Sequence, residues 1–286
     1  MSDSQKMSAT EFARMAQVLD RPEHVTGLEE GELVVDTIQV LSSTFMRIRG
    51  QLQGFRHADA WRKPNTTLRL EVPISNDAIS DMDTSSRVYT VAEMGDNYDI
   101  TIDAVRHDAD SPMMRWLASA QPGDRMVVKG PRQHQILQPG VKNYMFADAS
   151  ALPAVRNIIK NQPMSIPPTV VITAPMEDAQ TYLADCHGLA DMVYLETAKD
   201  VVDACRELNI TSTTTVWAAG ERDQMCMLRN YCKAECGVAR SALRIFGYWK
   251  RGTSHTLLDI ARLQAVKQRI DSGLNLELAD DFDLEI

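Results

Sequence analysis

The feature that most constrains the fold of this chain is a change in the spacing of its apolar residues near residue 142. From about residue 32 to residue 141 they fall in short, partly alternating runs, which indicate antiparallel β-strands. Turn-forming segments at 63–65, 95–97 and 122–124 break these runs at intervals typical of a small barrel. Beyond residue 142 apolar strands alternate with helical stretches, and this order predicts a parallel α/β sheet.

The second half contains three clear apolar strands, PPTVVITAP, DMVYLET and TTTVWAAG. One helix is expected to begin near Leu152 and to stop at Pro163. Another is expected to run from about Asp223 to Cys236, where Gly237 is placed to cap it.

The two ends of the chain carry further helical signals. A capping-box spacing at 8–11 predicts a short N-terminal helix, and a last helix over about 255–272 leads into an acidic tail. We therefore divide the chain into residues 1–29, an N-terminal helix and linker; 30–141, the barrel; 142–252, the α/β domain; and 253–286, the C-terminal helix and acidic tail.

Charge and composition exclude several classes of function. The 39 acidic residues against 30 basic ones give a net charge of -9, which opposes binding to nucleic acid or to an anionic membrane. No apolar run reaches the roughly 18 residues that a membrane span needs, and the polar start lacks the order of a secretory signal. The five cysteines form no CxxC pair, so we expect reduced thiols and no metal site. We also expect a cytoplasmic location and take a monomer as the oligomeric state.

A short motif in the barrel region carries the first chemical signal. Arg87, Tyr89 and Thr90 match the R-x-Y-T/S flavin motif of the ferredoxin-reductase superfamily. An arginine can neutralise a pyrophosphate, a tyrosine ring can lie against a flavin ring, and a threonine hydroxyl can hydrogen-bond near the flavin N5 atom. The tetrapeptide alone is also compatible with an ordinary exposed strand, so its context decides.

That context is a series of segments whose order resembles one family. Together they cover roughly residues 30 to 252, and the chain is identified from them as similar to the siderophore-interacting proteins, the FAD-dependent ferric-siderophore reductases that include the vibriobactin-utilisation type. In chain order the segments are DAVRH (103–107), WLA (116–118), PGD (122–124), GPR (130–132), DASALPA (148–154), WAAGE (217–221), LRNY (228–231) and GYWKRG (247–252).

The resemblance implies an FAD-binding barrel followed by an NAD(P)H-binding α/β domain. FAD is then the resident cofactor, and NADPH or NADH is the electron donor. The residues expected to contact these two groups are Arg87, Tyr89, Thr90, His107, Ser111, Pro112, Ser150, Ala219, Gly220, Glu221 and Trp249.

The substrate implied is a ferric siderophore, an anionic catecholate or hydroxamate chelate. Such a chelate needs clustered cations even on an acidic protein. Lys250 and Arg251 directly follow Trp249, and Arg47 and Arg49 lie two residues apart on one predicted strand, so we expect these four to bind substrate.

Three positions depart from the family pattern. Ala92 stands where the family has a second arginine, and Ala149 replaces a glutamate. The H-G-x-x-G-P loop has become His107 to Pro112 without either glycine, and it carries Asp108 and Asp110 instead. These departures leave open whether the pyrophosphate loop binds FAD weakly.

The sequence therefore predicts a flavoprotein oxidoreductase of iron acquisition. A hydride passes from NAD(P)H to FAD, and single electrons then reduce the siderophore-bound iron(III) and release iron(II), with no side chain acting as nucleophile or general base. Two alternatives stay open: a general NAD(P)H:flavin reductase of the diaphorase type, and a non-catalytic carrier of siderophore or flavin.

Overall fold

The computed structural model describes residues 27–73, 84–107, 111–195 and 201–253, together with the single residues 258, 261 and 272. The predicted N-terminal helix, most of the predicted final helix, the acidic tail and the residues 108–110 lie outside these ranges. The barrel and the α/β sheet belong to one compact unit, Leu28–Tyr248, and the two ends of the chain form a second unit.

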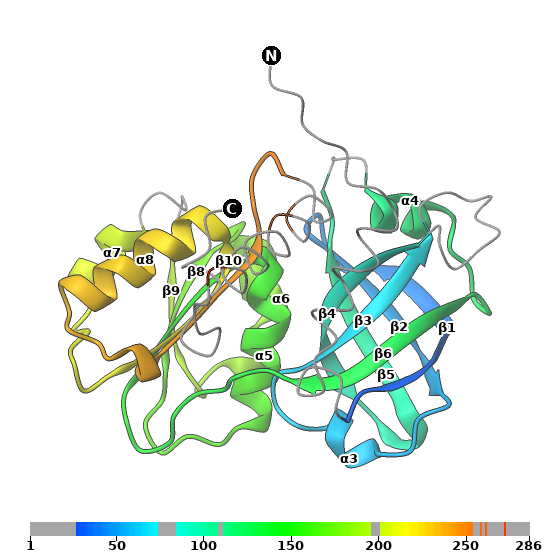
Figure 1. Cartoon of the computed structure of the whole chain (residues 1–286), viewed down its shortest axis with the longest axis horizontal. Helices are drawn as coiled ribbons and strands as arrows, with labels where there is room; N and C mark the ends of the chain where they lie inside the picture. Colours follow the sequence, from blue (N-terminus) through cyan, green and yellow to red (C-terminus); the bar gives the residue numbers. More distant parts are fainter. Residues whose placement is uncertain are drawn as a thin grey trace. The chain divides into compact units, whose positions relative to one another are not determined.

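Six strands close into an antiparallel barrel, as the short alternating runs predict (Figure 1). Around the barrel their order is β1-β2-β5-β4-β3-β6. Alternate residues of β3, such as Leu68 and Leu70, fill the interior, while Arg69 between them faces outward. The strands are β1 (Glu29–Val40), β2 (Phe45–Gln53), β3 (Thr66–Pro73), β4 (Thr84–Met94), β5 (Asp99–Val105) and β6 (Arg125–Gln133).

Two short helices complete the barrel. Helix α3 (Ala58–Trp61) places Trp61 in the core, and α4 (Pro112–Ser119) packs Met113, Trp116 and Leu117 against the same core. Ser111 caps α4 by accepting a hydrogen bond from the Met114 amide at 3.3 Å, and Pro112 occupies the first turn.

A five-stranded sheet with order β11-β10-β7-β8-β9 forms the second half. The strands are β7 (Asn143–Asp148), β8 (Thr169–Thr173), β9 (Asp191–Tyr194), β10 (Thr215–Glu221) and β11 (Leu243–Trp249). The β10-β7-β8-β9 pairings are parallel, which confirms the predicted fold class. The sequence pattern names only three of the five strands, because β7 and β11 are short apolar runs without a clear period.

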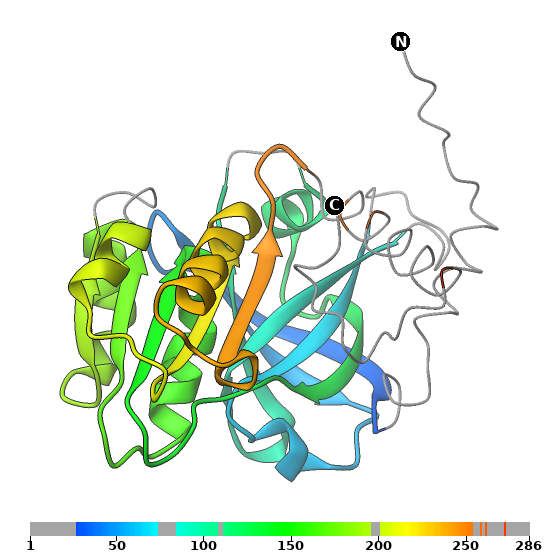
Figure 2. The ribbon, with the colours of Figure 1, turned by 60° about the vertical axis from the view of Figure 1, so that its left-hand side comes forward.

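Helices cover both faces of this sheet. Helices α5 (Leu152–Asn161) and α6 (Met176–Tyr182) lie on one face, and α7 (Val201–Glu207) and α8 (Arg222–Ala234) lie on the other (Figures 1 and 2). Helices α5 and α8 match the two predicted helices to within about two residues, and Gly237 follows α8 with a φ of +67°. Among the described residues, no helix is long and apolar enough to span a membrane.

The strand order reverses between β7 and β10. From β7 the chain runs outward through β8 to β9 and then returns to β10 on the other side of β7. In an open α/β sheet, ligands bind in the crevice at the carboxyl ends of the two strands on either side of such a reversal. The ends of β7 and β10 are Asp148 and Glu221, so the fold points to the segment predicted to meet the nicotinamide.

Candidate functional site

The flavin motif lies on β4, next to β3. Thr90 pairs with Thr67, Tyr89 with Leu68 and Arg87 with Leu70. Tyr89 packs against the barrel core, and its burial raises the pKa of its hydroxyl. The nearby positive charge of Arg87 offsets only part of this rise. Thr90 is buried at the end of the motif.

Tyr248 on β11 connects this barrel motif with the sheet. Burial is the strongest influence on the Tyr248 hydroxyl and raises its pKa. The Asp148 carboxylate also raises this pKa, and an interaction with Thr90 lowers it. The Tyr248 hydroxyl is buried and makes no hydrogen bond of ordinary geometry to any described residue. Residues on β4 and β7 therefore both influence one buried hydroxyl on β11, although the sequence analysis does not assign Tyr248 to the site.

Asp148 organises the crevice between β7 and β10. Its Oδ1 accepts hydrogen bonds from the Ser150 amide at 2.8 Å and the Ser150 hydroxyl at 2.5 Å. Its Oδ2 accepts the Glu221 amide at 3.0 Å. Ser150 and Glu221, both predicted site residues, thus share one carboxylate, while the Glu221 side chain caps α8 by accepting from the Gln224 amide.

Gly220 makes this arrangement possible because it lies directly against Asp148. A Cβ atom built on Gly220 would stand 2.7 Å from the Asp148 Oδ2 atom, closer than real Cβ contacts allow. The preceding Ala219 is fully buried in the sheet core. In the sequence, the available sign of a role for Asp148 is its place at the end of an apolar run. Only the pairing of β7 with β10 places it beside the WAAGE segment.

The predicted pyrophosphate segment is described only at its two ends. His107 is exposed after β5, and Ser111 and Pro112 start helix α4. The loop between them, which holds Asp108 and Asp110, lies outside the described residues. A capped helix start suits an anion, because its free amides and dipole both favour negative charge.

Arg47, which is predicted to bind substrate, pairs with the buried carboxylate of Asp103. Its Nε and Nη2 atoms each lie 2.7 Å from an oxygen of Asp103, a residue that is 3% exposed. The hydrogen bond to Asp103 raises the pKa of Arg47, against the effect of burial. Arg47 also lines a cavity of about 300 Å³ together with Arg156 and Tyr182, so its contact with substrate stays a prediction.

The other predicted substrate cations are less constrained. Arg49 is exposed and lines a cavity of about 720 Å³ that also contains Asp36 and Asp99, so its place in substrate binding stays a prediction. Lys250 and Arg251 lie in a tight turn closed by a bridge between Lys250 and Thr253, directly after Trp249 at the end of β11. Their contacts with substrate, and that of Trp249 with a cofactor, also stay predictions.

The structure brings together cations that the sequence analysis missed. Arg69 on β3 and Arg132 on β6 lie on adjacent strands, where Arg132 pairs with Thr67 and Arg69 with Lys129. Burial lowers the pKa of His134 most strongly, and the positive charges of Arg132 and Arg69 lower it further, to about 4. We call Arg69, Arg132 and His134 the basic cluster. Only the closed barrel reveals it, because its members are up to 65 residues apart in sequence.

The residues present fit a flavin. The buried Tyr248 hydroxyl makes no hydrogen bond of ordinary geometry to any described residue, Arg87 supplies a cation on the same strand as Thr90, and a capped helix start follows β5. The crevice formed by Asp148, Gly220 and Glu221 supplies a separate place for a nucleotide at the sheet.

Comparison with known proteins agrees with these two halves. A family model described as the siderophore-interacting FAD-binding domain matches residues 37–135, and one described as the siderophore-interacting protein matches residues 141–252. The ferric acinetobactin reductase of Acinetobacter baumannii is 31% identical over 277 residues, which cover 93% of this chain and 94% of that protein.

Solved structures share the same architecture. The siderophore-interacting protein from Acinetobacter baumannii superposes with a TM-score of 0.77 at 28% identity, over 86% of this chain and 100% of that one. A ferredoxin reductase of carbazole 1,9a-dioxygenase matches with a TM-score of 0.59 at 12% identity, over 78% of this chain and 70% of that one, a likeness of fold alone.

Proposed function

The chain belongs to the siderophore-interacting protein family, and from this premise we propose that it is an NAD(P)H-dependent ferric-siderophore reductase with FAD as its resident cofactor. The name of its Acinetobacter baumannii relative, ferric acinetobactin reductase, supports a ferric siderophore as the substrate class. A cytoplasmic place of action fits its five free thiols.

The observation that carries the proposal is that Thr90, on the barrel, and Asp148, on the sheet, both act on the buried Tyr248 hydroxyl. Thr90 ends the flavin motif on the barrel, and Asp148 holds the Glu221 amide at the sheet crevice. A flavin held at Thr90 would then face a nucleotide held at Gly220 and Glu221. Two groups that exchange a hydride must be adjacent, and this arrangement supports that requirement.

The reaction needs a cofactor that accepts two electrons together and passes them on one at a time. NAD(P)H gives up a hydride, which carries two electrons, whereas each siderophore-bound iron(III) accepts only one; bound FAD supplies the ability to take the pair and return single electrons. One NAD(P)H therefore reduces two iron(III) ions, and one proton is released. Iron(II) binds hard oxygen ligands far less tightly than iron(III), so the chelate releases it.

The protein contributes position and charge. Arg87 and the start of α4 at Ser111 and Pro112 would hold the pyrophosphate, and Tyr89 and Thr90 would contact the flavin ring. Ser150, whose hydroxyl is oriented by Asp148, would lie near the ring, and Ala219, Gly220 and Glu221 would border the nicotinamide. We retain Trp249 as a ring contact and His107 as a neighbour of the phosphates.

The basic cluster is proposed as the main attraction for an anionic chelate. Burial and the charge of Arg69 lower the pKa of Arg132, so an arriving anion would offset part of the electrostatic cost of holding these two cations. Lys250 and Arg251, from the family segment at the end of β11, are proposed separately as substrate-binding residues.

The decisive assay mixes the FAD-loaded protein with NADH or NADPH and ferric siderophores of different charge, in the presence of a ferrous chelator. We expect a ferrous signal that depends on FAD and on the nucleotide. A colourless protein that takes up no added FAD would instead favour the non-catalytic carrier, and no ferrous signal with either donor would remove the reductase.

Charge reversal separates this reductase from a general flavin reductase. We expect R69E/R132E to raise KM for an anionic ferric siderophore about tenfold, and to leave the rate with a neutral quinone acceptor within about twofold. Arg206→Glu on the outer helix α7 serves as a matched control and should change neither value (Figure 1). Equal KM values for R69E/R132E and the unmodified protein would favour the general reductase.

A further inference from the structure

Helix α5 carries two adjacent polar residues on an otherwise apolar surface. Every residue from Leu152 to Ile159 is buried, because α5 contacts the sheet strand β7 on one side and the barrel strand β4 on the other. Arg156 is 8% exposed and Asn157 is 5% exposed. Polar groups this deeply buried are costly unless each finds a partner, so their bonds show what the helix holds in place.

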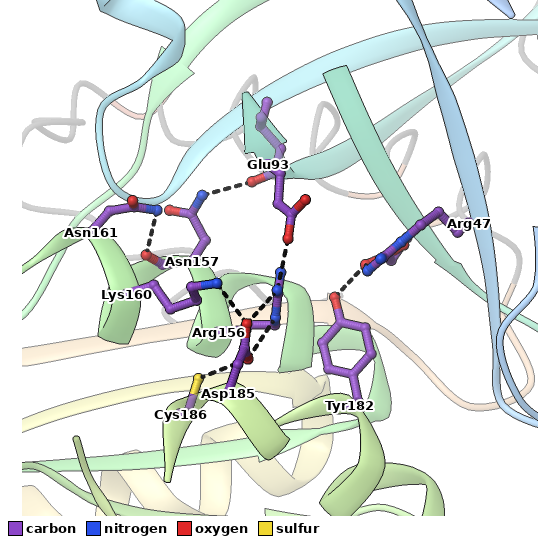
Figure 3. A network of polar contacts seen from close by, with 11 residues as sticks. Arg47, Glu93, Arg156, Asn157, Lys160, Asn161, Tyr182, Asp185 and Cys186 are labelled. Carbon is purple, nitrogen blue, oxygen red and sulfur yellow. Dashed lines mark hydrogen bonds and ion pairs between the residues drawn. The ribbon is translucent and has the colours of Figure 1, made fainter. Parts of the chain in front are cut away.

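Asn157 binds two barrel segments at once. Its Nδ2 atom donates to the Val91 carbonyl at 2.8 Å, and its Oδ1 atom accepts the Asn65 amide at 2.8 Å. Val91 directly follows Thr90 on β4, and Asn65 directly precedes β3, where Thr67 pairs with Thr90. One side-chain amide therefore joins β4 and the residue before β3 at the level of the flavin-motif threonine. Figure 3 shows Asn157 on α5, beside Arg156.

The bonded carbonyl lies at a break in the strand ladder. The register of β4 against β5 shifts between Val91 and Glu93, which leaves Ala92 as an extra residue. A bulge interrupts the regular hydrogen bonds and bends the strand, so its geometry depends on contacts from outside the sheet. Ala92, where the family pattern has arginine, is 3% exposed.

Arg156 holds the other side of the bulge. Its Nη2 atom lies 2.7 Å from the Glu93 carboxylate and 2.6 Å from Asp185, and its Nε atom bonds Asp185 at 3.0 Å. Lys160, one turn later, also bonds Asp185 (Figure 3). The two polar residues of α5 thus bind β4 at Val91 and at Glu93, on either side of Ala92.

Helix α5 also starts at the nucleotide crevice. It follows the Asp148 to Ser150 segment directly, and about five residues, a rise of roughly 7.5 Å, separate its first residue from Asn157. The helix is therefore a rigid connection between the crevice at the end of β7 and the bulge on β4.

We propose that Asn157 is a positioning residue for hydride transfer, which sets the place of Thr90, and hence of the flavin ring, relative to the nicotinamide crevice. This inference rests on the proposed function. It predicts that loss of the Val91 bond slows transfer from NAD(P)H much more than it weakens FAD binding, because a displacement of about 1 Å between reacting groups costs up to about a hundredfold in rate.

Asn157→Asp tests this with a change of one atom. The carboxylate still accepts the Asn65 amide, but it turns a repelling oxygen toward the Val91 carbonyl. A protonated carboxyl regains the donor, and burial raises the pKa of such a group above the ordinary aspartate value. We expect reduction of bound flavin by NAD(P)H to slow about ten- to a hundredfold at pH 8, and to recover as the pH falls toward 5.5.

Asn161→Asp is the matched control. Asn161 is exposed on the same helix, where its amide donates to the Asn157 carbonyl at 3.0 Å, and N161D should show no pH-dependent recovery. Reduction of the bound flavin by dithionite, which needs no nucleotide site, and the Kd for FAD should change less than about threefold in N157D. A merely structural role would move these two values together with the rate.

Three outcomes decide the inference. The inference is overturned if N157D and N161D have the same rate of flavin reduction by NAD(P)H at every pH. It is also overturned if N157D loses FAD binding and dithionite reduction in parallel with that rate. Should N157D unfold above pH 7, Asn157→Ala removes both bonds without adding charge and is expected to slow transfer equally at all pH values; an unchanged rate in N157A also overturns it. Failure of the proposed function shows separately, as unmodified protein whose bound FAD is not reduced by NAD(P)H.

Discussion

At the scale of single residues, the site depends on one close approach. Gly220 and Asp148 touch so closely that no side chain fits between them, and the same carboxylate orients Ser150 and the Glu221 amide. Three hydrogen bonds fix the orientation of this carboxylate, so Asp148 organises the crevice by positioning Ser150 and Glu221.

Gly220→Ala is expected to force Asp148 aside. We predict a loss of about 1–3 kcal/mol in the free energy of unfolding, from overpacking in a buried site, and a marked rise in KM for NAD(P)H. Urea unfolding and steady-state kinetics measure the two effects. Gly140→Ala is the control, because that glycine also has a positive φ but would bring its Cβ within 4 Å of nothing; equal KM values in the two variants would contradict this account of Gly220.

His134 is the second informative residue, since burial and two arginines keep it neutral. Its pKa in the folded protein is about 4, against about 6.5 for an unperturbed histidine. The unfolded chain therefore binds more protons than the folded protein between these values. Stability that is fully present above about pH 6.5 is lost progressively as the pH falls toward 4.

His134→Gln should remove this part of the acid sensitivity. We expect the unmodified protein to lose up to about 3 kcal/mol more than the variant between pH 7 and pH 4, as measured by urea unfolding at several pH values. Identical pH profiles for the two proteins would show that burial and the two arginine charges do not hold His134 neutral.

At the scale of elements, helix α6 bonds to the barrel through Asp178, which accepts from the Ser43 hydroxyl at 2.7 Å, and through Tyr182. The Tyr182 hydroxyl donates to the Asp103 carboxylate at 2.6 Å, and its ring stacks on Phe45 with centroids 4.5 Å apart. Burial raises the pKa of Tyr182, so its hydroxyl remains a donor. Arg47 completes the group by pairing with the same carboxylate (Figure 3).

Tyr182→Phe keeps the stacked ring and removes only the hydroxyl. A hydrogen bond to a charged group contributes about 1.5–3 kcal/mol, and we expect a loss of that size in the free energy of unfolding. Tyr98→Phe is the control, because the Tyr98 hydroxyl makes no hydrogen bond to any described residue. A loss below about 0.5 kcal/mol in Y182F would mean that Asp103 is satisfied by Arg47 alone.

The helix α5 shows what sequence patterns do and do not reveal at this scale. Its start at Leu152 and its end before Pro163 follow from local chemistry and were predicted. The roles of Arg156 and Asn157 were not, because their partners lie on a barrel strand more than 60 residues away. A polar pair inside an apolar helix was the available signal, but only the packed fold supplies its partners.

At the scale of the whole molecule, the order of parts was predictable and the convergence of parts was not. The change of apolar period near residue 142 predicts a barrel followed by an α/β sheet, and the fold confirms it. The pairing of Arg47 with Asp103 could not be predicted, because two residues sharing a strand face says nothing about which neighbour occupies that face. The basic cluster was missed for the same reason, since β3 and β6 are neighbours only in the closed barrel.

The central claim is that this chain uses a bound flavin to divide an electron pair between two iron ions. An anaerobic titration tests it most directly: limiting NAD(P)H is added to the FAD-loaded protein with excess ferric siderophore and a ferrous chelator. The account predicts two iron(II) ions for each NAD(P)H oxidised, and none when FAD is omitted. Oxidation of NAD(P)H without iron(II), or the same iron(II) yield without FAD, would contradict it.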